Sequence, residues 1–334
     1  MKISNIEALR SLVTSAGVVV LTGALAAAVV AVPASATDTV DRATGTPVNV
    51  AQPESADLAA QIVSPFVDPT EAELSTRAGS GRVTANVWPK RGTYGVGVIP
   101  KVTFSRKIPL AKRAGVEERL SVNSTKPRSG SWRWVDGRTA LYRGAKFWPA
   151  HSTVKVKAKL GSLNKGTGMR WSKTTARGKF NVDRKMVIRV NAATHKGSWR
   201  IDGRRVGKFV TSTGKSGFRT RSGIKTVMDK HRVLRMTNVG VTNDEVYDLQ
   251  VPYAMRLTPS GEFLHAAPWN GRIGQANTSH GCTHLTLSQA KYFFDRLIWG
   301  DPVITKKTGR SMETTNGPGA PWNIPYAQWA NSNA

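Results

Sequence analysis

The chain of 334 residues contains one cysteine, Cys282, so no disulfide can form within it. Whatever fold the chain adopts must therefore be held together by burial of apolar side chains. The N-terminus has the features of a secretion signal, and exported proteins usually pair their cysteines or have none. An unpaired cysteine in such a chain is either an intermolecular link or a free reactive thiol.

The N-terminal segment combines the three parts of a signal peptide. Lys2 and Arg10 supply positive charge, residues 12–32 are largely apolar, and residues 34–36 (Ala-Ser-Ala) form a small-x-small cleavage site. We therefore predict that residues 1–36 are a signal peptide cleaved after Ala36, and that the mature protein is secreted. The alternative is an uncleaved membrane anchor, because the apolar run is nearly long enough to span a bilayer.

Charge is distributed unevenly along the mature chain, although the formal net charge of the whole is +28 at pH 7. Residues 37–80 hold seven acidic and two basic residues without hydrophobic periodicity, which predicts a flexible acidic linker. Residues 81–184 hold 24 lysines and arginines against four acidic residues. This excess predicts attraction to polyanions, and the alternative is a solvated basic surface with no single partner. Export argues against nucleic acid and leaves wall polymers, anionic lipids and acidic glycans.

Residues 81–184 have the pattern of a β-sandwich. Residues 101–104 and 154–160 alternate apolar and polar side chains with a period of two, and glycine-containing turns separate the runs. Four tryptophans are candidates for packing inside the sandwich or between its sheets: Trp132, Trp134, Trp148 and Trp171. Trp134 and Trp148 could instead be platforms on which sugar rings stack.

A second β-rich region begins near Met186. Strands are predicted at residues 186–190 and 206–211, with a hairpin turn at Asp202-Gly203. Ser288 is predicted to cap a helix over residues 289–299 that Gly300 ends. Beyond residue 308 the tail carries three aromatic residues, which indicates docking onto this domain: Trp322, Tyr326 and Trp329.

The neighbours of Cys282 suit thiolate chemistry. Three of the six histidines in the chain lie close to it in sequence, at His265, His280 and His284. A thiol near its ordinary pKa of about 8.5 is only slightly ionised at neutral pH, so a catalytic cysteine needs a base or a positive field. Gly281 lets the backbone approach a substrate closely and leaves amide groups for an oxyanion.

Two other interpretations of Cys282 exist. It could be a buried structural cysteine, because cysteines are often buried, but its neighbours are polar and include glycine. It could also bind zinc together with the histidines. The spacings match no recurrent zinc pattern and there is no second cysteine, so we expect no metal and no other cofactor.

Residues 279–282 (Ser-His-Gly-Cys), with His265 upstream, resemble the active-site signature of the L,D-transpeptidases of the YkuD type. Residues 253–269 resemble the segment that leads into the catalytic histidine of that family, and residues 213–223 resemble its glycine loop. The family acts on bacterial cell walls, so the resemblance places the protein at the wall. It implies an enzyme, a cysteine acyltransferase, with a mainly β fold.

The likeness extends to the flanking regions. Residues 130–132 and 147–151 resemble parts of the immunoglobulin-like domain that precedes the catalytic domain in actinobacterial members. Residues 322–329 resemble their docked C-terminal extension. The resemblance thus implies an immunoglobulin-like sandwich over 81–184, a β-rich catalytic domain with one or two short helices over 185–307, and an extension over 308–334 that packs on the catalytic domain.

The resemblance also implies roles for individual residues. Cys282 matches the nucleophile, His265 the general acid and base, and Ala266 the residue whose carbonyl orients that histidine. His280 and Gly281 match the oxyanion site, together with a tyrosine, Tyr247, that closes over the donor. The remaining matches are substrate-binding positions: Ser260, Gly261, Trp269, Ser279, His284 and Met236, the last within a lid of about residues 235–249.

Two features depart from the family pattern. His284 replaces an asparagine and Thr283 replaces an apolar residue, and the spacer between His265 and Ser279 is 13 residues, slightly shorter than usual. Histidine can donate and accept hydrogen bonds as asparagine does, but it adds bulk and, if protonated, charge that would lower the thiol pKa. A deletion at residues 270–272 would account for the shorter spacer. We interpret both departures as tuning of substrate or rate.

The implied reaction joins peptide stems of peptidoglycan. Cys282 would attack the amide between an L- and a D-centre of a tetrapeptide stem, expel D-alanine and pass the acyl group to an amine, to water or to a protein amine. Carbapenem β-lactams are the inhibitors that the resemblance implies, and anionic wall polymers are expected to contact the basic domain. The alternative is a catalytically silent wall-binding protein, and a papain-like protease lacks support because Cys282 follows the histidine in a β-rich setting.

Overall fold

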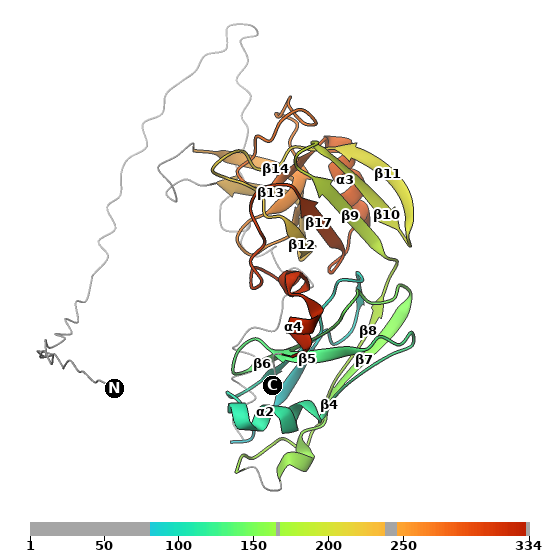
Figure 1. The fold of residues 1–334 in the computed structure, drawn as a ribbon, viewed down its shortest axis with the longest axis vertical. Helices are drawn as coiled ribbons and strands as arrows, with labels where there is room; N and C mark the ends of the chain where they lie inside the picture. Colours follow the sequence, from blue (N-terminus) through green and yellow to red (C-terminus); the bar gives the residue numbers. More distant parts are fainter. Residues whose placement is uncertain (1–80, 165–167, 238–245, 332–334) are drawn as a thin grey trace, which may run out of the picture. The chain divides into compact units, whose positions relative to one another are not determined.

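The structure is a computed structural model that describes residues 81–164, 168–237 and 246–331 (Figure 1). All of them belong to one compact unit, residues 58–334. The predicted signal peptide and acidic linker lie outside the described residues, as does the centre of the predicted lid. Within the described ranges, every helix is too short or too polar to cross a membrane.

The first domain is a sandwich of two four-stranded sheets, as its alternating pattern predicts. One sheet has the order β1(Ala85–Trp88), β3(Lys101–Phe104), β6(Thr139–Gly144), β5(Gly130–Trp134), and the other the order β2(Thr93–Tyr94), β8(Ala176–Val182), β7(Ser152–Ala158), β4(Leu120–Ser124). A helix, α2 (Leu110–Glu117), and a 3-10 turn, η2 (Gly161–Asn164), complete it.

All four tryptophans singled out in the sequence belong to the sandwich core, at 0–8% exposure. The indole N–H of Trp148 donates to the Val98 carbonyl (2.8 Å), and that of Trp134 donates to Glu117 Oε1 (2.6 Å). Each buried indole nitrogen in these two residues therefore has a partner. Core packing is confirmed, and burial contradicts the alternative in which Trp134 and Trp148 present open faces to sugars.

The second domain contains two further open sheets around one core (Figure 1). The five-stranded sheet has the order β11(Arg204–Val210), β10(Lys196–Ile201), β9(Met186–Asn191), β17(Pro302–Lys306), β12(Gly223–Thr226). The four-stranded sheet has the order β13(Asp229–Thr237), β14(Asp248–Arg256), β15(Phe263–Ala266), β16(Thr283–Leu285). Asp202 and Gly203 both have positive φ (47° and 88°), as a tight hairpin turn between β10 and β11 requires.

The helix α3 spans Leu287–Arg296, so its predicted boundaries at 289 and 299 were wrong. Thr286, not Ser288, is the N-cap, because its side chain and that of Gln289 each accept from the other's backbone N–H and form a capping box. The helix ends early because Leu297 turns extended (ψ 142°) and is completely buried. Gly300 lies beyond the end of the helix.

The C-terminal extension contacts both domains. Its 3-10 turn η3 (Ala320–Asn323) lies against β12, where Asn323 Oδ1 accepts from Ile224 N (2.7 Å). The following helix, α4 (Tyr326–Ala330), packs on β5 of the sandwich, whereas we predicted that the extension packs on the second domain. Trp329 is fully buried there and donates to the Ser131 carbonyl (3.1 Å). Trp329, the last aromatic residue of the tail, is thus buried against the sandwich. The sequence pattern did not indicate this location.

Candidate active site

Two parallel strands bring the histidine and the cysteine regions together. Strand β15 runs parallel to β16, with His265 opposite His284 and Leu264 opposite Thr283. Cys282 immediately precedes β16, and the next residue, Thr283, is the one that pairs with Leu264. The strand pairing therefore joins positions about twenty residues apart in the sequence within one cleft.

That cleft has a volume of about 530 Å³ and is lined by β13, β14 and β15, by the turn between β14 and β15, and by the segment that leads through Cys282 into β16. Most of the predicted site residues line it: Met236, Tyr247, Ser260, Gly261, His265, Trp269, Ser279, His280, Cys282 and His284. Ala266 and Gly281 do not line it: the Ala266 carbonyl contacts the His265 ring, and the Gly281 backbone is bound to Ser279 and Thr220. Met236 also packs in a small apolar cluster with Cys282 and Phe263.

His265 is held as a neutral base. Its side chain is 2% exposed, and its Nδ1 lies 2.7 Å from the carbonyl of Ala266. Since a carbonyl only accepts, Nδ1 carries the proton and donates it, which leaves Nε2 as the acceptor. Burial lowers the pKa of His265 to about 4, so the ring is uncharged at neutral pH.

Cys282 is held as a neutral thiol. Its Sγ donates to the Gly261 carbonyl at 3.6 Å, and the side chain is partly exposed. Burial in the surrounding protein raises its pKa to about 11, which outweighs a hydrogen bond from the Phe263 backbone and the positive charge of Lys225. With a neutral imidazole and a neutral thiol, ionisation must accompany attack on a substrate.

The loop that carries the cysteine is fastened at several points. Ser279 Oγ donates to the Cys282 carbonyl (2.6 Å) and accepts from Gly281 N (3.1 Å). Thr220, in the glycine loop, donates to the Gly281 carbonyl (2.8 Å). Gly281 has φ 124°, a conformation that side-chain-bearing residues rarely adopt. The Ser279 hydroxyl and the Gly281 amide are therefore used inside the loop, which limits the amides available for an oxyanion.

Tyr247 and His280 lie against each other, with ring centroids 5.1 Å apart. His280 also packs edge-to-face on Phe218 of the glycine loop, at 4.6 Å. Burial raises the pKa of the Tyr247 phenol, and the nearby Cys282 sulfur acts in the same direction. The phenol therefore stays protonated and able to donate a hydrogen bond toward the cleft.

His284 lies directly beside the candidate base. Its ring centroid is 4.7 Å from that of His265, and its Nδ1 accepts from Asn270 Nδ2 (2.9 Å). Burial lowers the pKa of His284 to about 3, and repulsion from His265 and His280 adds to this. The ring is neutral, so it does not supply the positive charge that a protonated His284 would have placed beside the thiol.

Trp269 and the turn that contains Ser260 form walls of the cleft. Trp269 is 45% exposed and stacks on His265, at 6.3 Å between ring centroids. Ser260 and Gly261 lie in the turn between β14 and β15, and Ser260 Oγ accepts from Asn316 Nδ2 of the C-terminal extension (2.9 Å). The tail therefore reaches a turn that lines the cleft.

The sequence did not indicate a buried ionic cluster beside the cleft. Lys225 is 0% and Glu262 3% exposed, and Lys225 Nζ donates to Glu262 Oε2. Arg221 Nη1 donates to the other oxygen, Oε1 (3.0 Å). Glu262 lies between Gly261 and Phe263, both of which touch Cys282 through their backbone. The sequence did not predict burial of Lys225, because a lysine in a strand is usually exposed and only the tertiary fold buries this one.

No group of three or more histidine, cysteine, aspartate or glutamate side chains is placed to hold a metal ion among the residues that the structure describes. The chemistry open to this cleft is that of a thiol next to a neutral imidazole. Such a pair suits attack on a carbonyl and transfer of its acyl group.

The comparisons with known proteins agree with the fold. Residues 58–164 match the model of a bacterial Ig domain, and residues 185–305 match that of the L,D-transpeptidase catalytic domain. L,D-transpeptidase 2 of Mycobacterium tuberculosis is 29% identical over 72% of this chain and 59% of its own length. The chain thus spans about three fifths of that relative.

Two further similarities cover the relatives more fully. Probable L,D-transpeptidase 3 of Mycobacterium tuberculosis is 31% identical over 70% of this chain and 90% of its own length. An LD-transpeptidase solved in complex with imipenem superposes with a TM-score of 0.57 and 26% identity, over 68% of this chain and 99% of its own.

Proposed function

Because the chain belongs to the L,D-transpeptidase family, we propose that it cross-links peptidoglycan peptide stems through a thioester on Cys282. The observation that carries the proposal is the hydrogen bond from His265 Nδ1 to Ala266, which leaves Nε2 as an acceptor in the cleft of Cys282. This arrangement gives the thiol a base without any metal or nucleotide.

Acylation begins when a donor stem displaces water from the cleft. Cys282 Sγ attacks the carbonyl of the amide between the L- and D-centres, and the thiol proton passes to His265 Nε2. The C–N bond then breaks, and His265 returns the proton to the departing amine of D-alanine. The products are a thioester on Cys282 and free D-alanine.

The Cys282 thiol and the His265 imidazole are both neutral before substrate binds, which is consistent with proton transfer during the attack. A thiol of pKa about 11 beside an imidazole of pKa about 4 does not form an ion pair in the free protein. Attack therefore moves the proton as the C–S bond forms, so charge develops mainly on the substrate oxygen. The Tyr247 phenol and the backbone near His280 are the groups we assign to that oxygen.

Deacylation reverses the proton movements with a second nucleophile. A stem amine loses its proton to His265, attacks the thioester carbonyl and leaves a new amide, while Cys282 regains its proton. Water in the same position would make a carboxypeptidase, and a protein amine would make an anchoring enzyme. The exposed Trp269 beside His265 is the surface that an acceptor would contact.

We further propose that the protein acts outside the cytoplasm, after cleavage behind Ala36. The surplus of positive charge over residues 81–184 supports attraction to anionic wall polymers. Attraction of this kind weakens as salt concentration rises.

Imipenem tests the thioester step directly. Attack by Sγ on the β-lactam carbonyl opens the ring, so the protein should gain the whole mass of the drug. Cys282→Ala should gain none, and His265→Gln should react at least about a hundredfold more slowly for want of a base. An unreactive wild-type thiol would favour a silent wall-binding protein, and release of D-alanine from a tetrapeptide stem would exclude it.

A further inference from the structure

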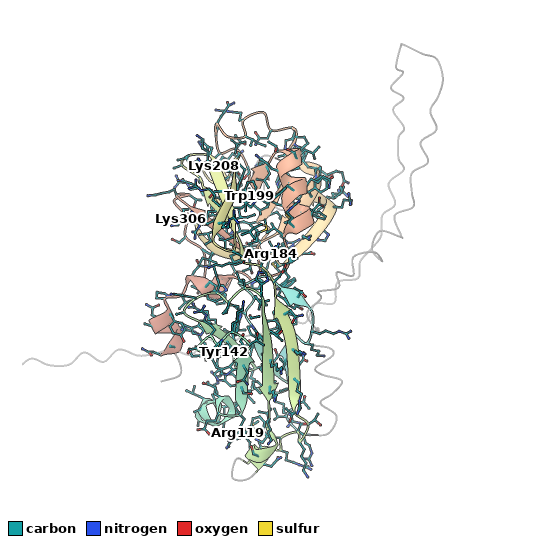
Figure 2. The ribbon with its side chains drawn as sticks, turned by 90° about the vertical axis from the view of Figure 1, so that its right-hand side faces the viewer. Arg119, Tyr142, Arg184, Trp199, Lys208 and Lys306 are labelled. Carbon is teal, nitrogen blue, oxygen red and sulfur yellow. The ribbon has the colours of Figure 1, made fainter. Side chains whose placement is uncertain are left out.

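The five-stranded sheet carries a row of basic side chains on its outer face. The acylation and deacylation steps proposed above do not use them. Side chains alternate between the two faces of a strand. Trp199 of β10 packs edge-to-face on Phe293 of α3, with ring centroids 5.2 Å apart, so its neighbours along the strand point to the opposite face. Figure 2 shows Lys208 and Lys306 on that opposite side, away from Trp199.

Strand register places these cations next to one another. Ser198 of β10 lies between Lys208 of β11 and Arg189 of β9. One pair further along, Asn191 of β9 lies between Lys196 of β10 and Lys306 of β17. Cations from four adjacent strands therefore alternate with small uncharged side chains.

These side chains line a groove of about 430 Å³. Six of its lining residues are basic and none is acidic: Arg189, Lys196, Arg205, Lys208, Lys306 and Lys307. Among the described residues, none of the six takes part in an ion pair, whereas the exposed Arg235, Lys291 and Arg310 each pair with a carboxylate. Like charges on one sheet face repel, so the arrangement costs stability unless an anion joins them.

The groove keeps a fixed position relative to the candidate nucleophile. The turn after β9 is tied to Asn277, whose Nδ2 donates to the Ala192 carbonyl (3.0 Å). Asn277 Oδ1 lies 3.1 Å from His195 Nδ1 and accepts from Thr213 N (3.0 Å). Asn277 lies just before the loop of residues 279–282, so the edge of the groove and the cysteine loop share one anchor.

We propose that this groove binds a linear phosphodiester polymer of the cell wall, and so holds the catalytic domain on its substrate. The proposal rests on the proposed function, since it assumes action at the wall. Several cations in series fit a repeating anion better than a single phosphate. The lining contains no aromatic side chain on which a nucleic-acid base would stack, and no large exposed apolar side chain that would enter a lipid surface.

The test compares two triple charge reversals of the full chain. One reverses the groove (R189E, K208E and K306E), and the matched control reverses three exposed lysines of the sandwich (K155E, K157E and K179E). The probe is fluorescein-labelled linear poly(glycerol phosphate), titrated by anisotropy at several salt concentrations. The groove variant should lose about tenfold or more in affinity, and its slope of log affinity against log salt should fall by about two. The control should lose less than about threefold at physiological salt, because salt screens the diffuse attraction of the sandwich surface.

Equal losses in the two triple variants would overturn the proposal, because they would reflect net charge alone. Tighter binding of single-stranded oligothymidylate of equal charge, or of vesicles of anionic phospholipid, would overturn it in favour of those partners. The neutral variant R189Q/K208Q/K306Q guards against a folding defect, and it should lose affinity in the same direction. Imipenem acylation should be unchanged in every variant, so failure of the groove and failure of the thiol chemistry are told apart.

Discussion

The sandwich and the catalytic domain each bury a cation, but they stabilise it by different means. In the sandwich, Arg143 is 2% exposed and forms no ion pair with a carboxylate of the described residues. Its guanidinium lies over the rings of Trp322 (5.1 Å) and Trp329 (4.7 Å), and it donates to the Ile324 carbonyl. Burial lowers its pKa to about 10, so it stays charged at neutral pH.

In the catalytic domain, Lys225 is completely buried and is paired with Glu262, which also accepts from Arg221. Burial lowers the pKa of Lys225, and the charge of Glu262 acts in the opposite direction. The aromatic arrangement attaches a tail to a sandwich that lacks disulfides, whereas the ionic arrangement stiffens a turn beside the candidate nucleophile. Cation–ring contacts with loose geometry are enough to attach the tail to the sandwich. A reacting group, in contrast, must be positioned within fractions of an ångström.

The largest effect is expected from Lys225→Met. It leaves Glu262 buried with Arg221 as its one strong partner, and breaking a buried ion pair in this way costs about 3–5 kcal/mol. Urea unfolding measures the loss, and Lys225→Met combined with Glu262→Gln should recover part of it. A single-variant cost below about 1 kcal/mol would mean that the pair is not a structural element of the cleft.

Acid should weaken the catalytic domain through His265 and His284. Their folded pKa values, about 4 and about 3, lie below the ordinary 6.5, so the unfolded chain binds more protons in this range. Stability is therefore fully present above pH 6.5 and is lost as the pH falls, by about 2 kcal/mol per histidine at pH 5.

Unfolding in urea between pH 7.5 and 5 checks this expectation. His284→Asn should flatten the pH dependence by about half. Arg143→Ala should lower stability equally at both ends of the range, because Arg143 does not titrate there. A pH slope that His284→Asn leaves unchanged would contradict the assignment of a buried neutral imidazole.

A smaller effect is expected from Arg143→Ala itself. Loss of the contacts to two indole rings and to the Ile324 carbonyl should cost about 2 kcal/mol. Hydrogen exchange of the α4 amides should rise. Arg133→Ala is the matched control, because Arg133 is more exposed although it also reaches the Trp329 ring, at 5.7 Å. Equal effects of the two variants would show that burial of Arg143 is unimportant.

The smallest effect concerns the contact between the tail and the cleft. Asn316→Ala removes the hydrogen bond to Ser260 Oγ and should raise KM for a donor stem about fivefold, at unchanged kcat. Ser260→Ala should do the same, and the double variant should be no worse than either single one. Strictly additive effects would mean that the two residues act separately.

The sequence predicts much of the architecture because its signals are local. Period-two alternation identified strands such as residues 101–104, and Asp202-Gly203 identified a hairpin through its turn chemistry. The helix boundaries were missed because Thr286 and Ser288 are both good caps, and only the capping box with Gln289 distinguishes them. The destination of Trp329 was missed because an aromatic side chain indicates burial without indicating the surface that buries it.

For the site, the sequence by itself determined the chemical groups: one thiol, nearby imidazoles and a glycine next to the thiol. Only the tertiary structure decided their state. The pKa values of Cys282, His265 and His284 depend on burial and on neighbours that are distant in sequence. The same holds for Lys225 and Glu262, 37 residues apart, and for the cation row that β-strand register assembles. Residue types are local properties, whereas desolvation and charge proximity arise only when the chain folds.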